Sequence, residues 1–254
     1  MRLEADIAAL ARGPAAVVGA VRDAAVRTGT DFSFLLAQAK VESGLDAGAR
    51  AATSSARGLF QFTRATWLEM VEAHGAQHGF GWAADMLKSG AAKAGTAARE
   101  AILALRDDPV AASLMAGELV RDNAAALQAK LGRAVGAVDL YMAHFLGAGG
   151  AGQFLSALAT TPERAAADVV PAAAAANRSI FYDKAGGARS LVEVQALLAG
   201  RLAKAGAGPG SGGEGLPLSG RSLPLSGGGL PEMAAGTAQT QARMAYMLLA
   251  ELGG

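Results

Sequence analysis

Helix start and stop signals recur along the chain from about residue 14 to 204, and they constrain the fold more than any other feature. Pro14 stands where a first turn would begin and Gly29 where that helix would end, while Asp108-Pro109 opens a long helix that ends near Gly132. Hydrophobic residues make up 52% of the chain and aromatic residues only 5%, and much of the apolar content is alanine. Because alanine is the best helix former and a poor strand former, we predict an all-α fold of closely packed helices.

Three further helices are predicted from the same kind of signal. Ser190 and Glu193 form a Ser-x-x-Glu capping box, which opens a helix that ends near Lys204. Thr63 is placed to cap a helix that ends near Gly75. Another helix runs through Leu140, Tyr141, His144 and Phe145 and ends at Gly147.

Composition divides the chain into three parts. Residues 1–204 carry the helix signals and form the predicted domain. Residues 205–236 are dominated by Gly, Pro, Ser and Leu and repeat Leu-Pro-Leu-Ser-Gly at 216–220 and 223–227, a composition that buries too little surface to offset its ordering entropy. We expect a flexible linker there, followed by a short C-terminal helix in residues 237–254.

Charge and composition argue against several classes of function. The 23 basic and 22 acidic side chains give a formal net charge of +1, so there is no electrostatic case for nucleic acid as a partner. The absence of cysteine excludes disulfides, thiolate metal sites and cysteine nucleophiles. His74, His78 and His144 do not have the spacing of metal ligands, and no strand precedes the glycine-rich residues 147–150, which read as a helix cap and a tight turn. We therefore expect neither metal nor cofactor.

No membrane or export signal is evident. The sequence has no run of 18 or more apolar residues, so no transmembrane helix is predicted. The uncharged stretch 13–21 is not a convincing signal peptide, because Glu4 and Asp6 precede it and Arg22-Asp23 follows where a cleavage site of small residues would lie.

Glu42 is the carboxylate that the helical pattern singles out. Thr30 or Asp31 is placed to cap its helix. Glu42 lies on the apolar stripe of that helix, which also contains Phe32, Leu35, Leu36 and Ala39. Burial raises the pKa of a carboxylate, and a carboxyl group that stays protonated near neutral pH can act as a general acid. The alternative is a structural glutamate held in a salt bridge at a helix end.

Three short blocks follow one another around this glutamate. They read Val-Glu-Ser-Gly-Leu at 41–45, Ala-Arg-Gly-Leu-Phe-Gln-Phe at 56–62 and Thr-Arg-Ala-Thr-Trp at 63–67, with a small polar loop between the first two. Together they resemble the soluble lytic transglycosylase family, which belongs to the lysozyme-like superfamily. That family carries a Glu-Ser pair, a Gly-Leu-Met-Gln stretch and an Ala-Thr helix start. The resemblance extends over about residues 15 to 204 and implies a lysozyme-like helical fold.

The resemblance also implies roles for individual residues. Glu42 would be the acid and base of the reaction, and Ser43 would help to orient it. Phe60 and Gln61 would line the sugar cleft, with Phe60 in the place of the family's usual methionine.

Two later blocks, at 139–147 and 177–183, resemble the family less closely. The family's usual Ala-Tyr-Asn-Ala-Gly is replaced here, so that His144 and Phe145 stand where tyrosine and asparagine are expected. The family tyrosine is thought to hydrogen-bond the catalytic glutamate, and either His144 or Tyr141 is placed to substitute for it, on one helical face with Phe145. A core histidine is the alternative for His144. In the last block Tyr182 either presents its hydroxyl to a sugar or packs in the core.

The sequence offers no clear second carboxylate. Asp31, Asp46 and Asp139 are the candidates, and none lies in a recognisable motif, although hydrolytic glycosidases usually need two carboxylates. The resemblance implies a route with one carboxylate, in which Glu42 protonates the leaving oxygen and then takes the proton of the sugar's own 6-hydroxyl. The predicted reaction cleaves the β-1,4 bond between MurNAc and GlcNAc of peptidoglycan and leaves a 1,6-anhydro-MurNAc end.

Two other functions stay open at this point. One is a muramidase that uses water, with Asp46 or another acid to position it, and the other is a non-catalytic peptidoglycan-binding module. Peptidoglycan glycan strands are the expected partner, in the periplasm or cell wall, by an unidentified export route. The Met-rich end of the tail suggests docking onto a protein partner, such as a flagellar, secretion or phage apparatus that needs local opening of the wall. The alternative is a disordered tail that the protein does not need.

Overall fold

The computed structural model describes residues 13–52 and 54–207 of the 254-residue chain. Within these ranges the chain forms eleven α-helices, two short 3-10 helices and no β-strand, which confirms the all-α prediction. None of the helices described is long and apolar enough to cross a membrane. The helices are α2 Pro14–Thr28, α3 Phe32–Ser43, α4 Arg64–His74, η1 Gly75–His78, α5 Gly81–Lys88, α6 Ala97–Ala104, η2 Leu105–Asp107, α7 Pro109–Leu131, α8 Ala137–Thr160, α9 Ala166–Val169, α10 Pro171–Ala176, α11 Arg178–Phe181 and α12 Leu191–Lys204.

The predicted division of the chain is only partly visible. The described residues 13–207 contain nearly all of the predicted domain. Most of the predicted linker and the whole of the predicted C-terminal helix fall in residues 208–254, outside the part that the structure describes, as do residues 1–12.

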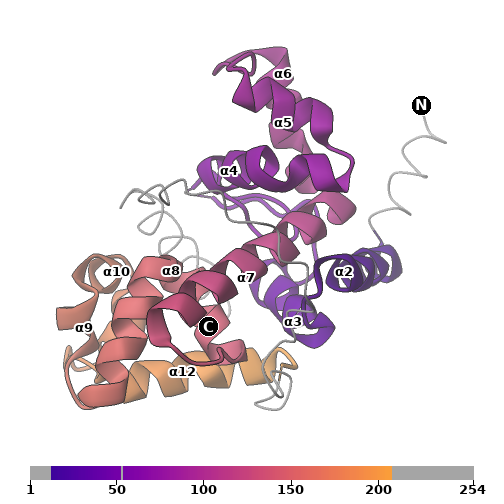
Figure 1. The fold of residues 1–254 in the computed structure, drawn as a ribbon. Helices are drawn as coiled ribbons and strands as arrows, with labels where there is room; N and C mark the ends of the chain where they lie inside the picture. Colours follow the sequence, from indigo (N-terminus) through magenta and orange to yellow (C-terminus); the bar gives the residue numbers. More distant parts are fainter. Residues whose placement is uncertain (1–12, 53, 208–254) are drawn as a thin grey trace.

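Helix α7 forms the centre of the fold. In Figure 1 it crosses the middle of the molecule, with α4 to α6 above it and α8 to α12 below, and both α2 and α8 pack along it. Helix α2 approaches α7 so closely that a Cβ atom on Gly117 would lie 2.4 Å from Oγ1 of Thr28. Only a glycine fits this contact, and the small alanine side chains buried along both helices allow the same close packing elsewhere.

The predicted helix starts are confirmed by their capping bonds. Thr63 caps α4 by accepting from the backbone N–H of Thr66, and Asp108 caps α7 with Pro109 as the first helical residue. Asp31, rather than Thr30, caps α3, and the predicted capping box of α12 is present. These bonds satisfy backbone N–H groups that the first turn of a helix leaves without partners, which is why local sequence could predict them.

The predicted stop at Gly147 is confirmed in part, because α8 consists of two helical segments that meet there at a kink. Gly147 has φ 73° and ψ 156°, so it interrupts the α conformation, but α8 resumes at once and continues to Thr160. The glycine-rich segment is therefore a kink and not a cap followed by a tight turn. Helix resumes because the following turns bury Phe154 and Leu155 in the core, where α8 packs against α7 and α12.

Candidate active site

Glu42 lies in the last turn of α3 and is 2% exposed. Leu35 and Ala39, on the predicted stripe, are fully buried, whereas Phe32 and Leu36 are only partly buried. The opposite side of the helix is buried as well, by Phe34, Ala37 and Gln38. Helix α3 thus runs through the core, and the carboxylate of Glu42 in its last turn lies in the interior of the protein.

The carboxylate of Glu42 is held by His144. The ring Nε2 of His144, on α8, lies 2.7 Å from Oε1 of Glu42, across 102 residues of sequence. The other ring nitrogen, Nδ1, is buried without a hydrogen-bond partner among the described residues. Because a buried N–H without an acceptor is costly, the geometry favours a neutral imidazole that carries its proton on Nε2 and donates it to Oε1.

The second oxygen of Glu42 is free of such a contact. No group in the described part of the chain hydrogen-bonds Oε2. This oxygen is also not fully buried. His144 can therefore keep its hydrogen bond to Oε1 while Oε2 gains or loses a proton. A carboxyl group with one fixed and one free oxygen is suited to act first as an acid and then as a base.

The ring of Tyr141 packs against the ring of His144. The two rings are stacked with centroids 6.4 Å apart and an interplanar angle of 17°. Tyr141 is 1% exposed, and burial, followed by the negative charge of Glu42, raises the pKa of its phenol above its ordinary value of 10.0, while Arg201 opposes the shift. Tyr141 consequently stays neutral and packs behind the imidazole, and His144 takes the contact with Glu42.

Ser43 connects Glu42 to the loop that follows it. Its hydroxyl lies 2.8 Å from the carbonyl oxygen of Leu59 and 3.1 Å from that of Ala39. The resemblance implied that Ser43 orients the carboxylate, but the hydroxyl contacts the loop instead of the acid. Ser43 thus sets the distance between the end of α3 and the segment that carries Phe60 and Gln61.

The loop that contains Phe60 and Gln61 is held against η2 by contacts that the sequence did not predict. Gly58 has φ 82°, and a Cβ atom there would lie 1.9 Å from the carbonyl oxygen of Arg106. The guanidinium of Arg57 forms a two-pronged ion pair with Asp107. Arg106 itself is buried and donates to the carbonyl oxygens of Ser55 and Phe62 over 2.7 and 3.2 Å. Burial and two nearby arginines lower the pKa of Arg106 to about 10, so it remains charged near neutral pH.

Gln61 stabilises the loop from within. Its side-chain amide donates to the carbonyl oxygens of Gly58 and Ala49 over 2.8 and 3.2 Å, and the side chain is buried. Its backbone has φ 48°, which is uncommon for a residue other than glycine and costs about 1 kcal/mol. Strain of this kind persists only where the surroundings enforce it.

Phe60, Gln61 and His144 border one pocket between α3, α4, α7 and the loop. The pocket is small, with a cavity volume of about 10 Å³, which is room for about one water molecule. Glu42 is not among its lining residues, although its partner His144 is. The structure thus brings together three of the predicted substrate-binding residues. The lining residues are Gln38, Phe60, Gln61, Phe62, Thr63, Thr66, Ala116, Leu119 and His144.

Phe145 and Tyr182 lie elsewhere. Phe145 is fully buried and stacks on Phe181, with centroids 6.4 Å apart, so it packs in the core. Tyr182 is partly buried, and the guanidinium of Arg178 lies 4.5 Å above its ring. Neither residue lines the pocket that His144 borders.

The three other acids that the sequence offered each have a partner other than Glu42. Asp46 is exposed and accepts from the backbone N–H of Gly48 over 2.7 Å. Asp31 caps the opposite end of α3, and Asp139 pairs with Arg133 at the start of α8. Within the described residues Glu42 therefore has no carboxylate partner from this set, and the contact it does have is an imidazole.

The arrangement can move a proton without a metal ligand set being present. Among the described residues, no group of three or more His, Cys, Asp or Glu side chains is arranged to hold a metal ion. What the site provides is a buried carboxyl group, an imidazole N–H on one of its oxygens and an apolar pocket beside that imidazole. No protein-family model matches the chain, so the chemistry rests on this geometry.

Proposed function

We propose that the chain is a lysozyme-like peptidoglycan lytic transglycosylase in which Glu42 is the catalytic acid and base. The observation that carries the proposal is the contact between Glu42 Oε1 and His144 Nε2, 2.7 Å long, at a carboxylate that is 2% exposed. A glycosidic oxygen is a poor leaving group and needs a proton from a general acid. A buried carboxyl group with one oxygen free can supply that proton.

The reaction divides into two proton transfers at the same oxygen. Glu42 donates the proton on Oε2 to the glycosidic oxygen, the bond between MurNAc and GlcNAc breaks, and the substrate's N-acetyl group stabilises the positive charge that develops on the sugar. The ionised Glu42 then takes the proton of the MurNAc 6-hydroxyl, whose oxygen bonds to the anomeric carbon. The products are a glycan with a free 4-hydroxyl and one with a 1,6-anhydro end.

His144 supports both steps through the other oxygen. Its Nε2–H donates to Oε1 throughout, and this bond is strongest when Glu42 is ionised, between the two transfers. The imidazole thus stands where the resembling family has a tyrosine and supplies the same kind of donor. The proposal needs no second carboxylate, in agreement with the positions of Asp31, Asp46 and Asp139.

The proposed setting is the periplasm or cell wall, where the chain would open peptidoglycan locally, in the service of an envelope-spanning apparatus. The C-terminal residues that would dock onto such a partner lie outside the described part of the chain.

Mass spectrometry of the fragments released from purified peptidoglycan tests the reaction. The expected result is anhydro-muramyl ends from the wild type and no release by Glu42→Gln, with both proteins equally folded by circular dichroism. Reducing ends would instead identify a water-using muramidase. Binding without release by the wild type would identify a non-catalytic module, and full activity of Glu42→Gln would remove Glu42 from the mechanism.

A further inference from the structure

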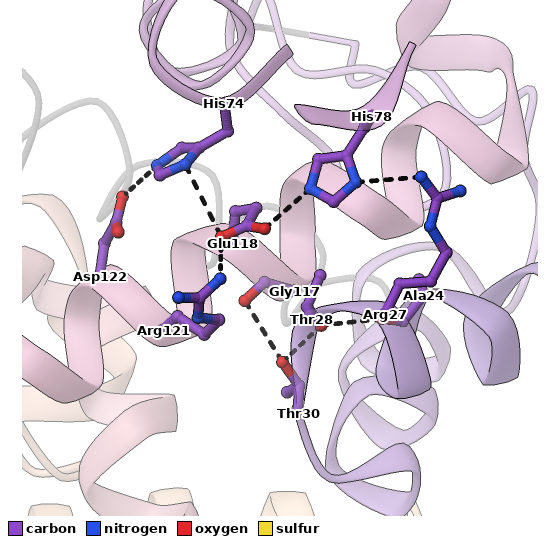
Figure 2. A network of polar contacts seen from close by, with 10 residues as sticks. All are labelled: Ala24, Arg27, Thr28, Thr30, His74, His78, Gly117, Glu118, Arg121 and Asp122. Atoms are coloured by element: carbon purple, nitrogen blue, oxygen red, sulfur yellow. Dashed lines mark hydrogen bonds and ion pairs between the residues drawn. The ribbon is translucent and has the colours of Figure 1, made fainter. Parts of the chain in front are cut away.

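A second network of ionisable groups surrounds Glu118 in the middle of α7. Glu118 is 1% exposed, and its carboxylate has three cationic or N–H neighbours, which Figure 2 shows. Oε1 lies 2.7 Å from Nε2 of His78, and Oε2 lies 2.9 Å from Nη1 of Arg121 and 3.7 Å from Nδ1 of His74. A carboxylate this deeply buried is tolerated because the network compensates for its lost hydration.

The proton state of His78 follows from its second neighbour. Nη2 of Arg27 lies 3.3 Å from Nδ1 of His78. A guanidinium can only donate, so Nδ1 must accept, and the single ring proton of His78 lies on Nε2, where it is donated to Glu118. His78 is thus a neutral link between α2 and α7, and protonation of its Nδ1 would break the contact with Arg27.

His74 is in the opposite situation, because both of its ring nitrogens face carboxylates. Nε2 lies 2.8 Å from Oδ2 of Asp122, and Nδ1, which is buried without a hydrogen bond, faces Oε2 of Glu118. Figure 2 shows the ring between these two acids of α7. The hydrogen bond to Asp122 and then the charges of Asp122 and Glu118 raise the pKa of His74 above 6.5, against burial and Arg121. The imidazolium is the form that this position favours.

The charged groups around His74 come from a small set of elements. Asp122, Glu118 and Arg121 belong to α7, and Arg27 of α2 reaches the network only through His78 of η1. The other helices that pack against α4, namely α5 and α6, contribute no charged group to this contact within the described residues. Arg121 already occupies the side of Glu118 that a cation would take, so the cluster is a protein ion-pair network.

The two helices that His74 joins also form a wall of the pocket beside His144. Helix α4 contributes Thr66 and its N-cap residue Thr63 to that wall, and α7 contributes Ala116 and Leu119. Gly117, between them on α7, accepts a hydrogen bond from Oγ1 of Thr30, just before the helix that carries Glu42. Glu118 lies between these two lining residues of α7 in the sequence, and His74 is the last residue of α4, about two turns beyond Thr66.

We propose that His74 is a positioning residue for the reaction, whose imidazolium holds α4 against α7 and so keeps the pocket wall in place, and whose deprotonation loosens that wall as the pH rises. The proposal rests on the proposed function for its effect on activity, but the clamp between the helices is a property of the protein alone. It predicts an alkaline decline in activity that belongs to His74.

Two substitutions at His74 distinguish the effect of its positive charge from the effect of its side-chain size. His74→Gln keeps a hydrogen-bonding side chain without the charge, and His74→Lys keeps a positive charge to about pH 10. We expect kcat/KM of His74→Gln to be about fivefold below wild type near pH 6, the size expected for a partly exposed ion pair, and equal to wild type near pH 9. His74→Lys should keep the activity of the wild type and lose the alkaline decline. The ratio of variant to wild type cancels any dependence on pH that the two proteins share.

Asp122→Asn is the second variant, because Asp122 is half exposed and its loss does not threaten folding. It should shift the midpoint of the alkaline decline to lower pH. Hydrogen–deuterium exchange, corrected for intrinsic rates, should show faster exchange at the end of α4 and in η1 for His74→Gln near pH 6 than for the wild type. A ratio of His74→Gln to wild type that does not change with pH, or equal exchange in both proteins, overturns the proposal. If the wild type releases no fragments, the proposed function has failed, and the exchange experiment alone decides on the clamp.

Discussion

His144 Nε2 and Glu42 Oε1 lie 2.7 Å apart, although 102 residues separate them in the sequence. The contact joins α8 to the last turn of α3 and leaves the second oxygen of Glu42 without a hydrogen-bond partner among the described residues. One oxygen is thus used for orientation and the other for proton transfer. The predictions below test this division of roles and the surroundings that maintain it.

Substitution of His144 should lower both activity and stability. His144→Phe leaves the buried carboxyl group of Glu42 without its donor, so the free energy of unfolding should fall by about 2 kcal/mol. The rate of fragment release should fall about 100-fold, because the carboxylate loses its orientation and its stabilisation between the two proton transfers. Chemical denaturation and fragment release from purified peptidoglycan measure the two effects.

His144→Tyr is the matched control for that experiment. It restores an aromatic side chain with a hydroxyl donor, as in the resembling family, and should retain more activity than His144→Phe. Equal activity of the phenylalanine variant and the wild type would show that the hydrogen bond to Glu42 has no part in the reaction.

Gly58 should not tolerate a side chain. In Gly58→Ala the new Cβ would meet the carbonyl oxygen of Arg106 at 1.9 Å, so the loop must move, and we expect a loss of about 3 kcal/mol in the free energy of unfolding. Gly29→Ala is the control, since Gly29 also has a positive φ, 67°, but has nothing within 4 Å of the added Cβ. The control should cost only about 1 kcal/mol, the penalty for the left-handed conformation. Similar losses in both variants would contradict the close contact.

The ion pair between Arg57 and Asp107 should be needed for activity as well as for stability. Arg57→Met leaves Asp107, whose side chain is 12% exposed, without its main partner, at a cost of about 3 kcal/mol. Fragment release per folded molecule should also decrease, because Arg57 precedes the loop segment that contacts Ser43. Arg133→Met removes a comparable partner from Asp139 at the start of α8 and serves as the control for activity. A fall in activity of the same size in both variants would indicate a general loss of stability.

Stability should decrease as the pH rises through the pKa of His74. That pKa is raised in the folded protein above 6.5, mainly by the hydrogen bond to Asp122, so the imidazolium stabilises the fold fully below the unfolded value. The stabilisation is lost as the pH passes from 6.5 upward through the folded value. Denaturation of the wild type and of Asp122→Asn across this range measures the effect, and the variant should show a smaller dependence on pH. Asp85→Asn, at an exposed acid of α5, is the control and should behave as the wild type.

Several helix boundaries were predictable because the forces that set them act within one turn. Asp108 and Pro109 begin α7, and the pair Ser190 and Glu193 begins α12, through contacts between residues at most three apart. At Gly147 the local signal correctly indicates an interruption, but burial of the following turns against α7 and α12 starts a second helical segment at once in place of the predicted tight turn. Local preference was outweighed there by tertiary packing.

The sequence by itself determined that α3 forms, that it is capped by Thr30 or Asp31 and that Glu42 falls on its apolar side. It also determined the loop motif in which Gly58 and Gln61 stand. Only the tertiary structure decided that His144, and not Tyr141, meets Glu42, that Phe145 turns into the core, and that His74 lies between two acids of α7. The reason is physical. Helical periodicity fixes which face a residue occupies, whereas the partner on that face depends on how helices distant in sequence pack together.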